Sequence, residues 1–213
     1  VGDDFQINPE DIEQKYFGVL TKLFNVARFA SQFPVPTSLE ELADNLQPED
    51  EWILSEFQLV MTRVEQAWKE IDIYTAAQSL KNFATGVLPS HWLEMVKSRL
   101  YDGDEAAAWT LHRIVRDLLD AFAPICPFFS HYLSSTLYNR SAVEAYTFPQ
   151  LTLNFETDKW AELTESVMFF NSEVWKMKKD QGLSLNSEIV GVSLPDNLDS
   201  LHISLTRMHK LIG

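Results

Sequence analysis

The segment from Gln47 to Asp72 constrains the fold more than any other part of the sequence. Apolar residues recur in it every three or four positions, at Ile53, Phe57, Val60, Met61, Val64, Trp68 and Ile71. On a helix this spacing places them in one apolar stripe, which has to be buried against other elements. The segment therefore predicts a long amphipathic helix and favours a mainly α protein.

Further helix signals lie on both sides of this segment. Asn8 and Pro9 are typical of a helix start, and that helix should end at Phe33, because Pro34 cannot continue it. Helices are also predicted over residues 74–88, 91–101, 102–123, 126–139 and 158–182. Pro89 is expected to separate the first two of these.

The pattern changes only after Gly182, which should end the last long helix. Residues 187–195 alternate enough to suggest a strand, and residues 202–208 are a second strand candidate. We therefore expect a mainly α helical bundle over residues 1–157. It should be followed, over residues 158–213, by the last long helix and a small α/β C-terminal subdomain that contains strands.

Apolar runs and cysteine content indicate the cellular environment. No apolar run approaches the length of about 18 residues that crosses a membrane, and the acidic start lacks the basic and apolar regions of a signal peptide. The single cysteine, Cys126, allows no internal disulfide and suits a reducing compartment. We expect a cytoplasmic, monomeric protein with no membrane partner.

The formal net charge of −14 argues against a nucleic-acid partner, because phosphate contacts need cationic side chains. The charge is unevenly distributed, however. Residues 1–72 carry 15 acidic and 5 basic side chains, whereas residues 73–101 contain Lys81, Lys97 and Arg99 against only Glu94. Local basic surface on an acidic body could therefore steer a polyanion to one face.

Residue patterns for catalysis or metal binding are absent from the sequence. The five histidines show no metal-ligand spacing, and there is no cysteine pair to complete a metal site. No glycine-rich phosphate-binding loop and no Gly-x-Ser-x-Gly nucleophile motif occurs. We therefore assign no catalytic residue, no metal ligand and no cofactor to this chain, and we favour a binding function.

Four stretches occur in the order and rough spacing found after the catalytic core of class I aminoacyl-tRNA synthetases. They are "KLFNVARF" at residues 22–29, "HWLEMVKSRLY" at 91–101, "LLDAFAPICPFFSHYL" at 118–133 and "FNSEVWKMKKDQGLSL" at 170–185. Together they resemble the anticodon-binding helical domain of the isoleucine, valine and leucine group, and the valyl-tRNA synthetase family most closely. The resemblance covers nearly the whole chain.

This resemblance implies a module that recognises the anticodon stem-loop of a tRNA, with valine tRNA as the expected partner. The family's activating machinery, a His-x-Gly-His motif and a Lys-Met-Ser-Lys-Ser loop, is absent from the chain. The resemblance thus implies a fragment that is not an enzyme alone. Its parent would be an ATP-dependent valine–tRNA ligase, whose catalytic domain is a further expected partner and would hold ATP and Mg²⁺.

The helix that contains residues 22–29 suggests where the tRNA would bind. Its apolar residues Leu20, Leu23, Phe24 and Ala27 fall on one side, and Lys22, Asn25 and Phe29 gather on the opposite side with Arg28 beside them. In the resembling family these positions look like those that meet the anticodon loop. An aromatic ring can stack on a loop base, an amide can bond a base edge, and a cation can hold phosphate. The alternative for Phe29 is burial by a neighbouring element.

Lys97 and Arg99 are two further candidates for tRNA binding. They follow apolar residues in 91–101 and could extend the basic surface toward the tRNA stem. The alternative is a solvated helix end, where cations interact favourably with the helix dipole. This alternative is stronger for Lys176, Lys178 and Lys179. The six tryptophans are expected mostly in the core.

Two alternatives for the whole chain stay open. Within the family, the same domain of isoleucyl-tRNA synthetase shares a stretch like residues 171–185. From another class, a helical protein-interaction adaptor would use the acidic N-terminal third as its docking surface.

Overall fold

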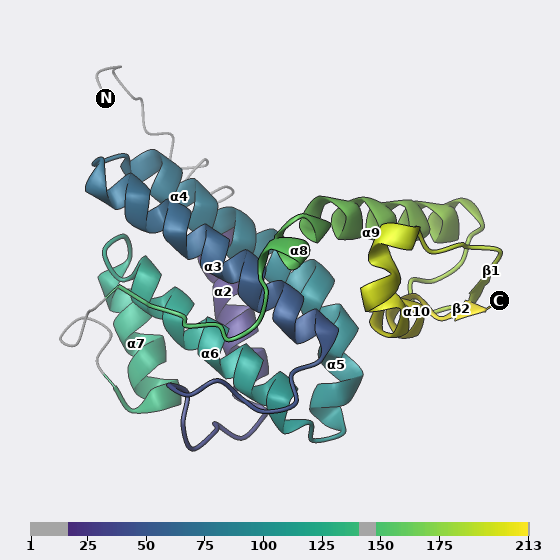
Figure 1. Ribbon diagram of the computed structural model, residues 1–213. Helices are drawn as coiled ribbons and strands as arrows, with labels where there is room; N and C mark the ends of the chain where they lie inside the picture. The colour runs from purple at the N-terminus through teal and green to yellow at the C-terminus, as the bar shows by residue number, and fades with distance from the viewer. Residues whose placement is uncertain (1–16, 141–147, 213) are drawn as a thin grey trace.

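Helices dominate the computed structural model, which describes residues 17–140 and 148–212 (Figure 1). The chain first forms α2 (Phe17–Ala30), α3 (Pro48–Lys69), α4 (Ile73–Asn82), the π-helix η2 (Phe83–Trp92), α5 (Leu93–Tyr101), α6 (Glu105–Phe122) and α7 (Pro127–Tyr138). It continues with α8 (Asp158–Ala161), α9 (Leu163–Asp180), β1 (Ile189–Val190), the 3₁₀-helix η3 (Asp196–Leu201), α10 (His202–His209) and β2 (Leu211–Ile212). The mainly α class is confirmed, while the expected helix start at Asn8 lies outside the described residues.

Helix α3 carries the apolar stripe that the sequence predicts. Ile53, Phe57 and Val64 on this stripe are fully buried. The helix ends at Lys69, earlier than the stripe suggests, and Ile71 is 79% exposed in a left-handed conformation with φ of 60°. This turn leads the chain into α4, which packs against α3.

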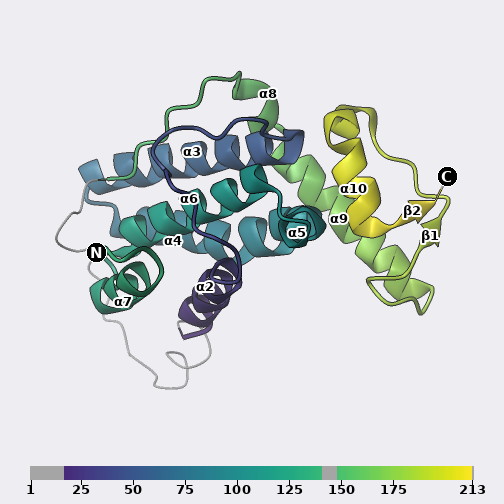
Figure 2. The ribbon, with the colours of Figure 1, turned by 90° about the horizontal axis from the view of Figure 1, so that it is seen from below.

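Helix α6 packs against α2, α3, α5 and α7 (Figure 2). Its buried Arg113 donates through Nε to Asp117 Oδ2 at 2.6 Å. The two terminal nitrogens of Arg113 donate to the carbonyl oxygens of Leu39 at 2.7 Å and Gln150 at 2.6 Å. Because these carbonyls belong to the loops before α3 and α8, a single side chain attaches both loops to α6.

The expected interruption at Pro89 is wrong, because α4, η2 and α5 follow one another without a break. Proline lacks the backbone N–H of a helical bond, and its ring clashes with the carbonyl four residues earlier. The π-helix has wider turns with bonds between residues five apart, as from Leu93 N to Leu88 O. These wider turns accommodate Pro89 and keep η2 aligned with α5.

The C-terminal part contains less strand than expected. β1 and β2 are two residues each and pair in parallel, Ile189 with Leu211 and Val190 with Ile212. The second strand candidate, residues 202–208, is wrong, because it lies in α10. The buried residues of this helix, Ser204, Leu205 and His209, do not alternate as those of a strand would, and Leu205 and His209 are one helical turn apart, as in a helix packed on one side.

Contacts from α8 and α9 attach the C-terminal part to the bundle. Trp160 of α8 donates to Glu51 Oε2 at 3.0 Å, and Trp52 of α3 donates to Thr164 Oγ1 of α9 at 3.1 Å. Helix α10 packs against α5 (Figure 2). Helix α9 ends before Gly182, whose φ of 68° confirms the predicted helix end. Among the described helices, none is long and apolar enough to cross a membrane.

Candidate nucleic-acid interface

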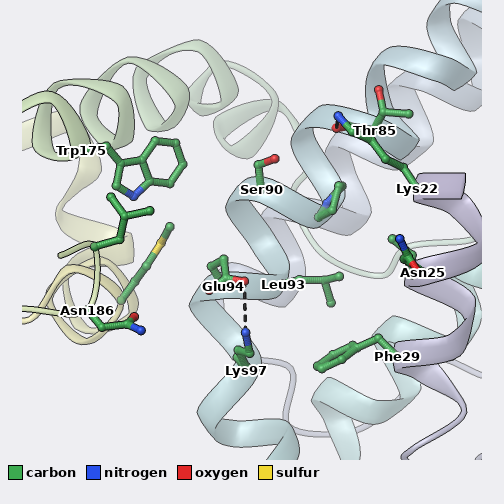
Figure 3. Close-up of a pocket in the computed structure, with 14 residues that line it drawn as sticks. Lys22, Asn25, Phe29, Thr85, Ser90, Leu93, Glu94, Lys97, Trp175 and Asn186 are labelled. Carbon is green, nitrogen blue, oxygen red and sulfur yellow. Dashed lines mark hydrogen bonds and ion pairs between the residues drawn. The ribbon is translucent and has the colours of Figure 1, made fainter. Parts of the chain in front are cut away.

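A groove of about 680 Å³ separates α2 from α9 (Figure 3). We call it the α2–α9 groove. One wall carries Lys22, Asn25 and Phe29 of α2, the floor carries Ser90, Leu93 and Lys97 of η2 and α5, and the opposite wall carries Trp175, Leu185 and Asn186. Four of the six residues that the sequence predicts for tRNA binding thus lie in one groove, although Lys22 and Lys97 are 75 positions apart in the chain.

The rotation of α2 about its axis brings its polar side chains to the groove. The buried residues of this helix are Leu23, Val26, Ala27 and Ala30. Phe24, which the sequence places with the apolar stripe, is instead 40% exposed. The face that packs on the bundle therefore includes Val26 and Ala30, which the predicted stripe did not contain, and Lys22, Asn25 and Phe29 lie beside it along the groove.

Phe29 combines the two alternatives that the sequence leaves open. The ring is half-buried and makes edge-to-face contacts with Phe33, at 5.1 Å between centroids, and with Tyr101, at 6.2 Å. It also lines the α2–α9 groove. Protein therefore supports part of the ring, while another part is open to a ligand. Tyr101, which is 61% exposed, extends this aromatic cluster at the surface and carries no prediction from the sequence.

Lys22 and Asn25 offer polar groups to the groove in different ways. The ammonium of Lys22 donates to the carbonyl oxygen of Thr85 in η2 at 3.2 Å, so this exposed cation is held across the groove's edge. The amide of Asn25 is exposed and has no hydrogen-bond partner among residues 17–140 and 148–212. Its donor and acceptor atoms are therefore available to a base edge.

Lys97 and Arg28 are exposed cations in different positions. Lys97 lies on the groove floor and forms an ion pair with Glu94 at 3.4 Å. Because this pair is exposed and therefore weak, Lys97 can exchange Glu94 for a phosphate at little cost. Arg28 is an exposed residue of α2 that does not line the groove, and within the described part of the chain its guanidinium forms no ion pair. The structure therefore does not bring Arg28 into the groove with the other candidates.

Arg99 does not extend the basic surface, which corrects the expectation from the sequence. Its side chain is buried, and its nitrogens donate to Glu49 Oε1 at 2.9 Å, Asp50 Oδ2 at 2.7 Å and Asp104 Oδ2 at 2.9 Å. Burial by itself lowers the pKa of the guanidinium, but the bonds to Asp50 and Asp104 outweigh burial and raise it. Arg99 therefore joins the start of α3 to the α5–α6 turn.

The wall opposite α2 was not predicted as a binding surface. Trp175 of α9 is half-buried and points toward the groove, and Leu185 and Asn186 follow it in the loop after α9 (Figure 3). The sequence places Trp175 with core tryptophans because it follows an apolar stripe. Its position in the stretch 170–185 that carries the family resemblance was the available signal.

The lysine group at residues 176–179 divides into two environments. Lys176 and Lys179 are exposed and line a shallow hollow beside Trp175. Lys178 is fully buried, and its Nζ donates to the carbonyl oxygens of Leu185 at 2.7 Å and His209 at 2.8 Å. Burial, together with the charge of Lys210, lowers the pKa of Lys178. Lys178 therefore fixes the loop after α9 rather than adding to an exposed basic surface.

A buried polar chain lies beneath this wall. Asn171 donates through Nδ2 to His91 Nδ1 at 2.8 Å and accepts through Oδ1 from His209 Nε2 at 2.7 Å. Burial, followed by the charges of Lys178 and His91, lowers the pKa of His209 to about 4, and burial lowers that of His91. Both imidazoles are neutral at physiological pH and link η2, α9 and α10.

A metal site is not apparent in the described residues. No group of His, Cys, Asp or Glu among residues 17–140 and 148–212 could hold a metal ion. His112 contacts the Tyr138 hydroxyl and the Phe33 carbonyl oxygen, each at 3.2 Å, and so is a core histidine with hydrogen-bond partners. The groove therefore offers stacking surface, amides and cations.

Comparison with known families identifies the class of protein. The model of the anticodon-binding domain of tRNA ligase matches residues 50–193, which is more than half of the chain. The chain belongs to this family. Most of the groove lies in the matched residues, and the α2 wall precedes them.

Three relatives of this chain are valine–tRNA ligases. The chain is 30% identical to the valine–tRNA ligase of Saccharolobus solfataricus over 190 residues, 89% of this chain and 22% of that protein. It is 32% identical to that of Pyrobaculum aerophilum, over 90% of this chain and 24% of that protein. It is 26% identical to that of Nanoarchaeum equitans, over 99% of this chain and 27% of that protein. The chain thus spans about a quarter of the length of these relatives.

Proposed function

We propose that this chain binds the anticodon loop of a valine tRNA in the α2–α9 groove. The observation that carries the proposal is the convergence of Lys22, Asn25, Phe29 and Lys97 on one groove in a member of the anticodon-binding family. Bundle packing alone gives no reason to gather a half-open aromatic ring, a free amide and two cations.

Each of these groups has a role that RNA chemistry supports. An anticodon loop presents unstacked bases, and the open part of the Phe29 ring offers a stacking surface, a contact of about 1–3 kcal/mol per base. The unpartnered amide of Asn25 reaches the edge of a stacked base. Lys22 and Lys97 contact the phosphates that flank that base.

The charge of the chain is compatible with this proposal. Among the residues that line the groove, Glu94 is the one acidic side chain, and it is already paired with Lys97. The net charge of −14 disfavours a polyanion elsewhere on the protein, so the cations of the groove would direct its approach. Because the groove carries two lysines and two asparagines beside its apolar residues, RNA uses this lining more fully than an apolar segment of a protein would.

The choice of valine rests on the three relatives named above, each of which is a valine–tRNA ligase. We further propose that the chain acts within a larger ATP-dependent valine–tRNA ligase. Amino-acid activation, with its ATP and Mg²⁺, and the contact to the catalytic domain would belong to that larger protein.

A binding titration with two RNAs tests the proposed function. The anticodon stem-loop of a valine tRNA and the same stem-loop with all anticodon bases exchanged are titrated with the 213-residue chain at moderate salt. We expect the valine stem-loop to bind more tightly, by at least the tenfold that about 1.4 kcal/mol represents. Equal affinity for both RNAs would refute specific anticodon recognition, and no binding to either would leave the protein-adaptor alternative.

A further inference from the structure

We propose that Trp175 is a second stacking platform for this RNA loop, facing Phe29 across the α2–α9 groove and binding a different nucleotide. Lys176 and Lys179 would hold the phosphates that follow this nucleotide. The inference rests on the proposed function and extends it from one wall of the groove to the other.

The position of Trp175 is the first argument. The indole is half-buried and points from α9 into the groove, and Ser90 and Leu93 of the floor lie between it and Phe29 (Figure 3). Because the floor separates the two rings, one base stacked on Phe29 does not cover Trp175. A second unstacked nucleotide of the same loop can fill the space beside the indole.

The unused donor of Trp175 is the second argument. Its indole N–H has no hydrogen-bond partner in the described part of the chain and is not among the fully buried polar atoms. The indole N–H groups of Trp68, Trp92 and Trp109 also lack partners, but they are buried within the protein. Trp175 therefore presents an aromatic ring together with a donor that a ligand can reach.

Rigid support of the indole is the third argument. Trp175 packs on His91, at 5.5 Å between centroids and 31° between planes, and meets His209 edge-to-face at 5.9 Å. Asn171 forms hydrogen bonds with both of these imidazoles, at 2.8 Å to His91 and 2.7 Å to His209. The platform is thus held in place before RNA arrives, so that binding does not require ordering this side chain.

Charge beyond the rim of the groove is the fourth argument. A shallow hollow continues on the far side of Trp175 and Leu185, and Lys176 and Lys179 line it. Both lysines are exposed, and neither forms an ion pair among residues 17–140 and 148–212. An aromatic platform with cations directly beside it is the arrangement by which proteins hold single-stranded RNA.

Substitution of Trp175 tests the inference with the valine stem-loop described above. Trp175→Leu keeps apolar bulk against the two histidines but removes the aromatic face, and Trp175→Phe restores an aromatic face. We expect the leucine variant to bind about 5- to 150-fold more weakly and the phenylalanine variant to recover most of this affinity. Phe169→Ala is the matched control, because Phe169 is an aromatic residue of α9 that is 71% exposed and outside the groove.

Abasic nucleotides, introduced one at a time into the loop, assign the two platforms. For one abasic position, we expect Trp175→Leu to cause no further loss of affinity for the RNA. For a different abasic position, we expect the same of Phe29→Ala. If both variants lose their effect at the same abasic position, the proposal that Trp175 binds a different nucleotide is refuted. A folded Trp175→Leu variant with wild-type affinity would refute it as well. In both cases a weakened Phe29→Ala variant would leave the proposed function standing. Failure of the wild-type chain to bind the stem-loop would refute both.

The lysines give an independent measurement. Lys176→Ala with Lys179→Ala should reduce the dependence of log K on log salt by about 0.7 for each phosphate that the variant no longer binds. Lys69→Ala is the control, since Lys69 pairs with Glu65 on the surface of α3, away from the groove. An unchanged salt dependence in the double variant would refute the proposed phosphate binding.

Discussion

The guanidinium of Arg99 donates to the carboxylate of Asp50 at 2.7 Å, and both side chains are buried. Glu49 and Asp104 complete the set of acidic partners around this one cation. A basic residue two positions from Lys97 thus joins α5 to the start of α3 through buried ion pairs, whereas Lys97 lies on the floor of the groove.

Arg99→Ala should therefore destabilise the protein without a direct effect on RNA binding. Removal of the cation leaves buried carboxylates without their partner, at an expected cost of about 3–5 kcal/mol in the free energy of unfolding. Urea denaturation measures this cost, and titration of the folded variant with the valine stem-loop measures affinity. A variant of normal stability with weakened RNA binding would show that Arg99 contacts RNA.

Phe29→Ala should separate the two roles of the half-buried ring. Removal of the stacking surface predicts a fall in affinity of about 5- to 150-fold, while removal of two edge-to-face ring pairs predicts about 0.5–1.5 kcal/mol of destabilisation for each. Phe128→Ala is the control, because Phe128 is 91% exposed and outside the groove. Large destabilisation with intact affinity would identify Phe29 as a packing residue only.

Lys22→Ala should lower both the affinity for RNA and its salt dependence. We expect the slope of log K against log salt to decrease by about 0.7, the value for one phosphate contact to a single strand. Lys69→Ala, which removes an exposed lysine far from the groove, should leave the slope unchanged. Equal slopes for Lys22→Ala and the wild type would contradict a phosphate contact at this position.

His209→Gln should reduce the sensitivity of the fold to acid. Burial depresses the pKa of His209 from 6.5 to about 4, so the stability that its neutral form contributes is complete above pH 6.5 and is lost as the pH falls toward 4. This contribution is about 3 kcal/mol at most. Glutamine retains a donor toward Asn171 but does not titrate.

The measurement is thermal unfolding of both proteins at a series of pH values, compared as a difference. The comparison is needed because Asp50 also titrates in this range. Burial raises its pKa from 3.8 to about 6, so protonated Asp50 stabilises the fold at low pH, and this stabilisation is lost as the pH rises through that value. We expect the wild type to lose more stability than His209→Gln on acidification. A parallel loss in both would contradict the assignment to His209.

Much of the fold could be predicted from the sequence because its helices bury one face. The buried stripe of α3 and the end of α9 before Gly182 were both predicted correctly, because periodicity and backbone preference act within a few residues. Pro89 and residues 202–208 were predicted wrongly. In both places the surrounding helices decide the local structure, through a π-helix in one and a packed α-helix in the other.

The α2 part of the candidate site was also accessible from the sequence, because Lys22, Asn25 and Phe29 are neighbours on one helix. The α9 wall was not, because nothing local to Trp175 indicates that it lies opposite Phe29. Likewise, Lys97 and Arg99 are equivalent in sequence, and only the acidic residues at the start of α3 distinguish them.

By itself, the sequence determined that this chain is a helical protein with a polar and aromatic helix face, and its similarity to known proteins placed it in the anticodon-binding family. Only the tertiary structure decided which cations remain exposed and which aromatic rings share a groove. The physical reason is that burial and ion pairing depend on residues far apart in the chain, and these meet only when the helices pack.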